Sequence, residues 1–215
     1  MKINTQLFKA GGSIVLVISL LSALYSFSIQ DEKKRIVFFG DSITAGYGLS
    51  TEQAFPALIQ SKLDSSKMDY QVINAGLSGE TSAGGLNRID WILKAKPDIF
   101  VLELGGNDGL RGLSLDETEK NLTIMIQKVR TRNPDVILFL SGMQIPPNLG
   151  QEYTERFRTL FAKVAKANNT ELIPFLLDKV GGEPELNLPD GIHPNVEGHH
   201  IVAETVWKNL KKYLD

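Results

Sequence analysis

The chain has 215 residues, of which 42% are hydrophobic and 22% charged, and its formal net charge is −2 at pH 7. This composition fits a single globular domain with a substantial core. Acidic and basic residues are interspersed, which argues against the one-sided basic surface of a nucleic-acid-binding protein and favours a small-molecule partner. Cys is absent, which excludes disulfides, Cys-based metal sites and a Cys nucleophile.

Residues 1–28 are predicted to be a signal peptide or an N-terminal membrane anchor. Lys2 and Lys9 precede a stretch without charge that continues to Asp31. Its apolar part, roughly residues 14–29, is longer than a usual signal core of about 7–15 residues and shorter than the ~20 expected of a spanning helix. Ser26-Phe27-Ser28 offers a small-x-small cleavage site, so both alternatives stay open. The expected location is periplasmic or secreted, with a possible tether to the inner membrane.

Five short apolar runs follow this leader and are predicted to be buried strands. They are RIVFFG from Arg35, YQVINAG from Tyr70, DIFVLELG from Asp98, DVILFLSG from Asp135 and ELIPFLL from Glu171. Segments of helical periodicity separate the runs, and a last helix is expected from about residue 195 to 214. Strands that alternate with helices imply right-handed crossovers and a parallel sheet. The prediction for residues 29–215 is one α/β domain, a three-layer α/β/α sandwich with a five-stranded parallel sheet.

Ligands of such sheets bind outside the carboxyl ends of the strands, so the loops that follow them are the candidate site. The first run ends at Gly40, which allows a tight turn that exposes Ser42 at the edge of the sheet. A serine hydroxyl is a weak nucleophile and needs a base that a third group orients. Among the three histidines, His193 lies ahead of the last helix, three residues after Asp190. This spacing lets the carboxylate reach Nδ1 of the ring and leaves Nε2 for Ser42.

Negative charge on a tetrahedral intermediate would also need hydrogen-bond donors. The backbone N–H groups of Ser42 and Gly79 and the side-chain amide of Asn107 could provide them, from three separate loops. Ser42 and Asn107 also have a plain structural interpretation, since Gly-Asp-Ser and Asn-Asp-Gly are common in turns.

Four segments together resemble a known family. GDSITAGYG, NAGLSGETS, LELGGNDGLRG and DGIHPN are similar, in order and spacing, to the four sequence blocks of the GDSL or SGNH hydrolases, and closest to the branch of bacterial thioesterase I, lysophospholipase L1 and arylesterases. The resemblance implies that family's flavodoxin-like fold, with Ser42 as nucleophile and Asp190 and His193 completing a triad. It also implies an oxyanion hole of Ser42, Gly79 and Asn107, and no cofactor. The first block reads Gly-Asp-Ser-Ile instead of Gly-Asp-Ser-Leu, a conservative change.

The loop GMQIPPNLG after the fourth run places apolar side chains where a polar loop would be usual. It looks like the substrate loop of the same family, and we expect Ile145, Pro146 and Leu149 to form one wall of an acyl groove. The alternative is that these residues only pack against the neighbouring helix, while Pro146 and Pro147 stiffen the loop.

The sequence therefore predicts a serine esterase that forms an acyl-enzyme and acts on small acyl esters, thioesters or lysophospholipids. The alternatives are a carbohydrate O-deacetylase and a non-catalytic binding protein on a hydrolase scaffold. A dinucleotide loop at Gly40–Gly46 is disfavoured because its spacing is not G-x-G-x-x-G. A metal site is also disfavoured, because the adjacent His199 and His200 would diverge on a helix and are expected to be solvated or locally bonded.

Overall fold

The computed structural model describes residues 33–214, so the predicted signal peptide or anchor lies outside the described residues. By its contacts the chain separates into Met1–Lys33 and Lys34–Asp215, and the second unit holds all the elements described below.

Five parallel strands form one sheet in the order β2-β1-β3-β4-β5. Their bounds are Lys34–Gly40 for β1, Tyr70–Gly76 for β2, Ile99–Glu103 for β3, Ile137–Ser141 for β4 and Glu171–Ile173 for β5. Each lies in or across one of the five predicted runs, so the predicted sheet is confirmed. The last strand is shorter than its run because Pro174 follows it, and proline has no N–H to continue the ladder.

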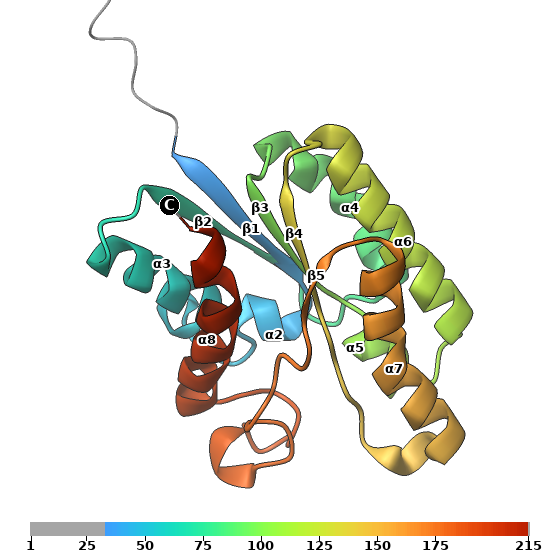
Figure 1. Ribbon diagram of the computed structural model, residues 1–215. Coiled ribbons are helices and arrows are strands. Elements are labelled where there is room, and N and C mark those ends of the chain that lie inside the picture. The colour runs from blue at the N-terminus through green and yellow to red at the C-terminus, as the bar shows by residue number, and fades with distance from the viewer. Residues whose placement is uncertain (1–32, 215) are drawn as a thin grey trace, which may run out of the picture. The chain divides into compact units, whose positions relative to one another are not determined.

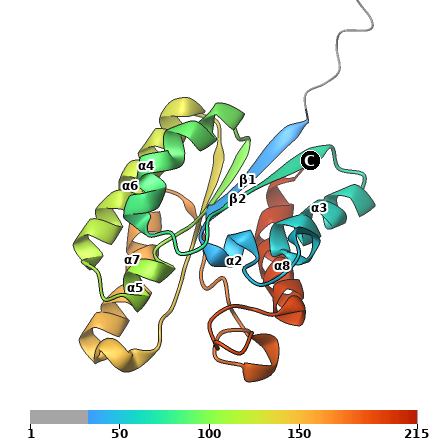
Figure 2. The same ribbon diagram turned by 180° about the vertical axis from the view of Figure 1, so that it is seen from behind.

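Helices cover both faces of the sheet, as Figures 1 and 2 show from opposite sides. The helices α3 (Phe55–Ser65) and α8 (Val196–Leu210) lie on one face, and α4 (Ser82–Ile92), α6 (Leu115–Arg132) and α7 (Gln151–Ala167) lie on the other. Two short helices, α2 (Ser42–Ala45) and α5 (Gly106–Leu110), directly follow β1 and β3. This is the predicted three-layer sandwich.

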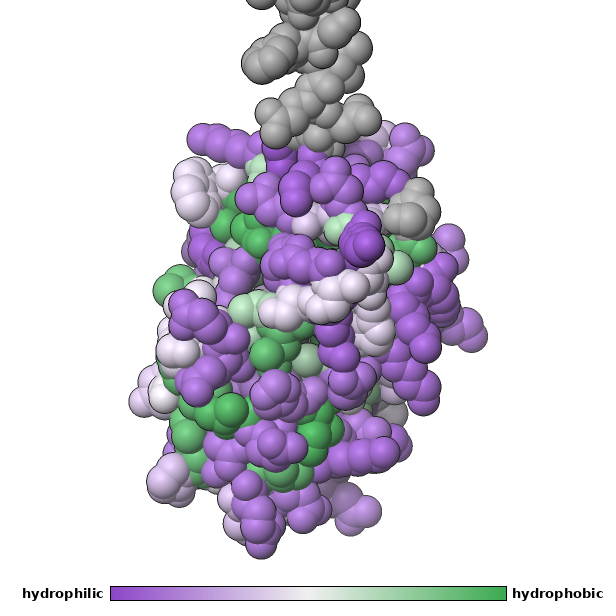
Figure 3. Space-filling view, turned by 90° about the vertical axis from the view of Figure 1, so that its left-hand side faces the viewer, coloured by the Kyte–Doolittle hydropathy of each residue, from purple (hydrophilic) through white to green (hydrophobic). Residues whose placement is uncertain are grey.

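The hydrophobic periodicity of the helices explains how they pack. On α6, Leu122, Met125, Ile126 and Val129 recur at helical spacing, and all four are fully buried. All five residues of β3 are buried, as expected for a central parallel strand covered on both faces. Seen from the side of α3 and α8, the surface is mostly hydrophilic, and its larger hydrophobic patches lie in the lower half (Figure 3).

The strand order places a topological switch point between β1 and β3. The chain leaves β1 for α3 on one face of the sheet, whereas it leaves β3 for α6 on the other face. Ligands of open α/β sheets bind at such a point, outside the carboxyl ends of the strands. The loops that begin at Gly40 and at Glu103 are therefore the centre of the candidate site.

Candidate active site

Ser42 is the first residue of α2, directly after the end of β1. Asp41 caps this helix, because its Oδ1 accepts the Ile43 N–H at 3.0 Å. Gly40 is required by close packing, since a Cβ there would lie 2.2 Å from Thr44 Oγ1 and 2.3 Å from Glu103 Oε2. The sequence Gly-Asp-Ser thus turns the chain sharply from the strand into a helical turn that carries the serine.

Asp190, His193 and Ser42 form a continuous series of hydrogen bonds. His193 Nδ1 lies 2.7 Å from Asp190 Oδ2, and His193 Nε2 lies 2.8 Å from Ser42 Oγ. With the ring proton on Nδ1 facing the carboxylate, Nε2 can accept the serine hydroxyl proton. The structure therefore brings together the three residues that the sequence predicts as a triad, although His193 lies 151 positions after Ser42 in the chain.

The loop itself holds Asp190 in its charged form. Its Oδ1 also accepts the backbone N–H groups of Ile192 at 2.9 Å and His193 at 3.0 Å. Partial burial acts to raise the pKa of Asp190, but these hydrogen bonds and the His193 ring lower it to about 2. The Tyr47 ring packs against the His193 imidazole, with ring centroids 4.5 Å apart.

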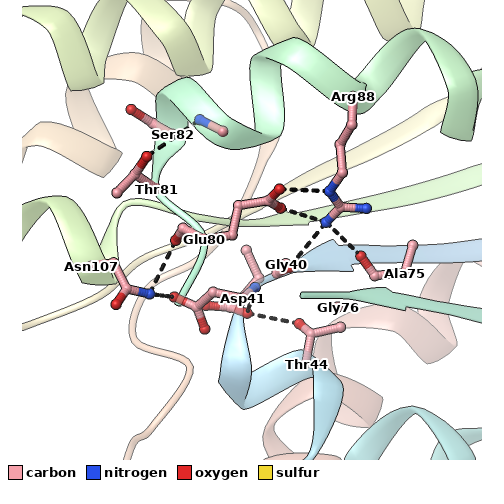
Figure 4. Close-up of polar contacts among 12 residues, drawn as sticks. Gly40, Asp41, Thr44, Ala75, Gly76, Glu80, Thr81, Ser82, Arg88 and Asn107 are labelled. Atoms are coloured by element: carbon pink, nitrogen blue, oxygen red, sulfur yellow. Dashed lines mark hydrogen bonds and ion pairs between the residues drawn. The ribbon is translucent and has the colours of Figure 1, made fainter. Parts of the chain in front are cut away.

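Asn107 lies at the start of α5, and its amide group has partners on three sides. Nδ2 donates to the Glu80 carbonyl oxygen at 3.0 Å and to Asp41 Oδ2 at 3.1 Å (Figure 4). Arg111 donates to Asn107 Oδ1 at 3.3 Å and, from the same nitrogen, to the Gly79 carbonyl oxygen at 3.0 Å. The three loops predicted to supply oxyanion donors therefore meet, and in the free protein both Nδ2 hydrogens face internal acceptors.

An ion pair that sequence reasoning missed supports the loop between β2 and α4. Glu80 is buried, and Arg88 of α4 binds both of its carboxylate oxygens while also donating to the carbonyl oxygens of Gly40 and Ala75 (Figure 4). The guanidinium lies over the Phe39 ring, 4.2 Å from its centroid. Eight positions separate Glu80 and Arg88, which is not the spacing of neighbours on a helix, so no local pattern predicts the pair.

A second missed feature is the buried carboxyl pair of Asp41 and Glu103. Glu103 Oε2 accepts the Asp41 N–H at 3.1 Å and the Thr44 hydroxyl at 2.7 Å, whereas Oε1 has no hydrogen-bond partner among residues 33–214. Burial and the nearby Asp41 charge raise the pKa of Glu103 well above its usual range, and burial raises the pKa of Asp41 to about 6. An acidic residue inside the apolar run DIFVLELG was the available sequence indication.

A cavity of about 470 Å³ opens beside Ser42 and His193. Its lining is mainly apolar and includes Ile145 and Pro146, as predicted for an acyl groove. Leu149 is not part of the lining: it is 40% exposed and lies near Gly112, so the predicted wall does not extend to it. Gly79 also lies outside the lining, although Arg111 links it to Asn107.

His199 differs from the expectation of a solvated or locally bonded residue. It is buried on α8, and its Nδ1 accepts the N–H of Phe55, which begins α3. Burial lowers its pKa to about 4, because the charged ring would lose its hydration there. Within residues 33–214, no group of three His, Cys, Asp or Glu side chains is placed to hold a metal ion. None of the helices in this part of the chain combines the length and the apolar composition that a membrane-spanning segment needs.

Comparisons with known proteins point in the same direction as this geometry. Residues 38–201 match the model of the GDSL-like lipase/acylhydrolase family. Esterase TesA of Pseudomonas aeruginosa is 42% identical over 200 residues, which are 93% of this chain and 98% of that protein. Thioesterase 1/protease 1/lysophospholipase L1 of Escherichia coli K12 is 37% identical over 84% of this chain and 85% of its own. A crystal structure of TesA, 43% identical, covers 83% of this chain and 99% of that chain with a TM-score of 0.79.

Proposed function

We propose, since this chain belongs to the GDSL-like lipase/acylhydrolase family, that it is a serine esterase with Ser42 as nucleophile, His193 as general base and Asp190 as the residue that orients the base. The observation that carries this proposal is the hydrogen-bond series from Asp190 through His193 to Ser42 Oγ. Each of the three residues has the chemistry that its place in the series requires.

The reaction follows from that series. As Ser42 Oγ attacks the acyl carbon, its proton moves to His193 Nε2, and Asp190 stabilises the resulting imidazolium. His193 then gives this proton to the departing alkoxide or thiolate as the bond from the acyl carbon to the leaving group breaks. Water repeats the sequence on the acyl-enzyme, with His193 again taking a proton, and releases the acid and free Ser42.

Oxyanion stabilisation is assigned to the N–H groups of Ser42 and Gly79 and to Asn107 Nδ2. One Nδ2 hydrogen faces Asp41 Oδ2 in the free protein, so the developing oxyanion would replace this carboxylate as its acceptor. The other hydrogen would stay on the Glu80 carbonyl and keep the amide in place.

The substrates we propose are small acyl esters, thioesters or lysophospholipids whose acyl chain enters the cavity beside Ser42. Two features support an apolar acyl group: Ile145, Pro146 and Phe175 line the cavity, and His193 is the only titratable side chain in the lining formed by the described residues. We further propose a periplasmic or secreted location, from the charge and length pattern of residues 1–28.

The decisive experiment compares the wild-type protein with Ser42→Ala on p-nitrophenyl esters from acetate to palmitate, with acyl-CoA, lysophospholipid and acetylated sugars alongside. We expect hydrolysis of fatty-acyl substrates that disappears in the variant, and labelling of Ser42 alone by a fluorophosphonate probe. Hydrolysis confined to acetylated sugars would favour the O-deacetylase. An unlabelled wild-type protein that hydrolyses none of these substrates would favour the binding protein.

A further inference from the structure

Arg111 joins two of the three proposed oxyanion donors. It is the C-cap residue directly after α5, and its side chain is solvent-exposed. A single nitrogen of its guanidinium donates to the Asn107 side-chain oxygen and the Gly79 carbonyl oxygen. The same nitrogen lies 3.0 Å from the Gly79 carbonyl oxygen and 3.3 Å from Asn107 Oδ1. These two acceptors belong to loops that follow different strands, β2 and β3.

This arrangement fixes which way the Asn107 amide faces. An amide can rotate by half a turn and exchange its oxygen and nitrogen, which would place an acceptor where a donor is needed. The cationic Arg111 can only donate, so its bond is possible only when Oδ1 faces it. Nδ2 is then left facing Glu80 and Asp41, on the side of the nucleophile's turn.

The charge of Arg111 is also available to the site. None of the ion pairs found among residues 33–214 involves Arg111. By contrast, Arg88, which supports the same loop, is bound to the buried Glu80. A guanidinium that donates to the oxygen of an amide polarises that amide and strengthens its N–H as a donor.

We propose that Arg111 is a positioning residue of the oxyanion hole, which holds Asn107 Nδ2 in the donating orientation and ties it to the Gly79 loop. This inference rests on the proposed function, in which Asn107 and Gly79 stabilise the oxyanion. An interaction that acts on the oxyanion is made in the transition state, so its loss should lower kcat and leave KM nearly unchanged.

The test is a double-mutant cycle with purified protein and p-nitrophenyl butyrate. We expect Arg111→Met to lower kcat by about tenfold with KM changed by less than about twofold, and Arg111→Lys, which keeps a charged donor, to lower it less. Asn107→Ala should lower kcat by about 10²–10³. Adding Arg111→Met to Asn107→Ala should have little further effect, because the group that Arg111 orients is already absent.

A matched control is Arg158→Met, which removes the same charge from α7, where Arg158 binds only Glu155 among the described residues, and it should leave kcat unchanged. A normal kcat in Arg111→Met would overturn the inference. The inference would also be overturned if Arg111→Met lowered kcat by the same factor in the wild-type protein and in the Asn107→Ala variant, since Arg111 would then act independently of Asn107. A normal kcat in Asn107→Ala would instead reject the oxyanion assignment within the proposed function, which keeps the two failures distinguishable.

Discussion

Asp41 and Asp190 show how one residue type acquires two roles from its surroundings. Asp190 is exposed and accepts three hydrogen bonds, which lower its pKa to about 2 in spite of partial burial. Asp41 is buried beside Glu103, and burial raises its pKa to about 6. Asp190 therefore carries its charge throughout the neutral range and can stabilise an imidazolium, whereas Asp41 begins to take up a proton just below neutral pH and caps α2.

Replacing Asp190 by Asn should lower kcat by about 10³–10⁴, because the neutral amide cannot hold the His193 tautomer or stabilise the imidazolium. The fold should persist, since the side chain is exposed. The measurement is kcat on p-nitrophenyl butyrate together with circular dichroism. A folded variant with more than about a tenth of wild-type turnover would show that Asp190 does not orient the base.

At the scale of elements, the residues that we propose for catalysis lie in segments that follow the strands, and helices pack beside these segments. The loop after β4 contributes Ile145 and Pro146 to the cavity, then moves away so that Leu149 faces solvent near Gly112. Behind the site, α3 and α8 are joined where the buried His199 accepts the Phe55 N–H. The loop can therefore be tested by the preference for acyl-chain length, and the pair α3 and α8 by the dependence of stability on pH.

Ile145→Ala should lower kcat/KM for dodecanoate esters by roughly tenfold and leave kcat/KM for acetate esters unchanged. The reason is that each buried methylene contributes at most about 0.8 kcal/mol to the binding free energy of the acyl chain. Leu149→Ala is the matched control, since it removes a similar side chain from the same loop outside the cavity lining. The measurement is kcat/KM for acetate, butyrate, octanoate and dodecanoate esters. An equal loss for every chain length in Ile145→Ala would contradict the acyl-wall assignment.

His199 should make the stability of the protein depend on pH. Its pKa is lowered from 6.5 to about 4 by burial, so the unfolded chain binds more protons between these values. Stability is then complete above about pH 6.5 and is lost as the pH falls towards 4, by up to about 3 kcal/mol. Across this pH range, the free energy of unfolding in urea should depend less on pH in His199→Asn than in the wild type. In His200→Asn, which changes an exposed residue, the dependence should be that of the wild type. Parallel curves for all three proteins would exclude this role.

The whole molecule combines a domain that carries its site at the switch point of one sheet with an N-terminal stretch of different composition. Residues 38–201, which match the family, contain every residue assigned to the site. Residues 1–28 contribute none of these residues, and their charge and apolar pattern is the basis of the location that we propose. Catalysis and location are therefore separable in experiments.

The full chain, expressed in a Gram-negative host, should reach the periplasm. Cleavage of the leader predicts a mature protein that begins at about Ile29, and retention predicts an intact chain in the membrane fraction. Fractionation followed by N-terminal sequencing distinguishes these outcomes. An intact chain in the cytoplasm would contradict both, without affecting the esterase assignment.

Several features of this protein could be read from its sequence because they depend on neighbouring residues. The apolar runs predicted the strands, and Gly40 predicted the turn before Ser42. The spacing of three residues predicted the contact between Asp190 and His193. Contacts of this kind form within one element or one turn, where spacing fixes geometry. The positions of the three histidines predicted the pairing of His193 with Ser42, and the resemblance in four blocks implied the same pairing.

Tertiary structure decided the contacts between elements that are distant in the chain. Asp41 and Glu103 meet only because β1 and β3 are adjacent in the sheet, and Arg111 reaches Gly79 only because the loops after β2 and β3 converge. The placement of Leu149 outside the cavity depended on the path of its loop. No local pattern encodes such contacts, because strand order and the packing of the two helical layers are determined by burial across the whole domain.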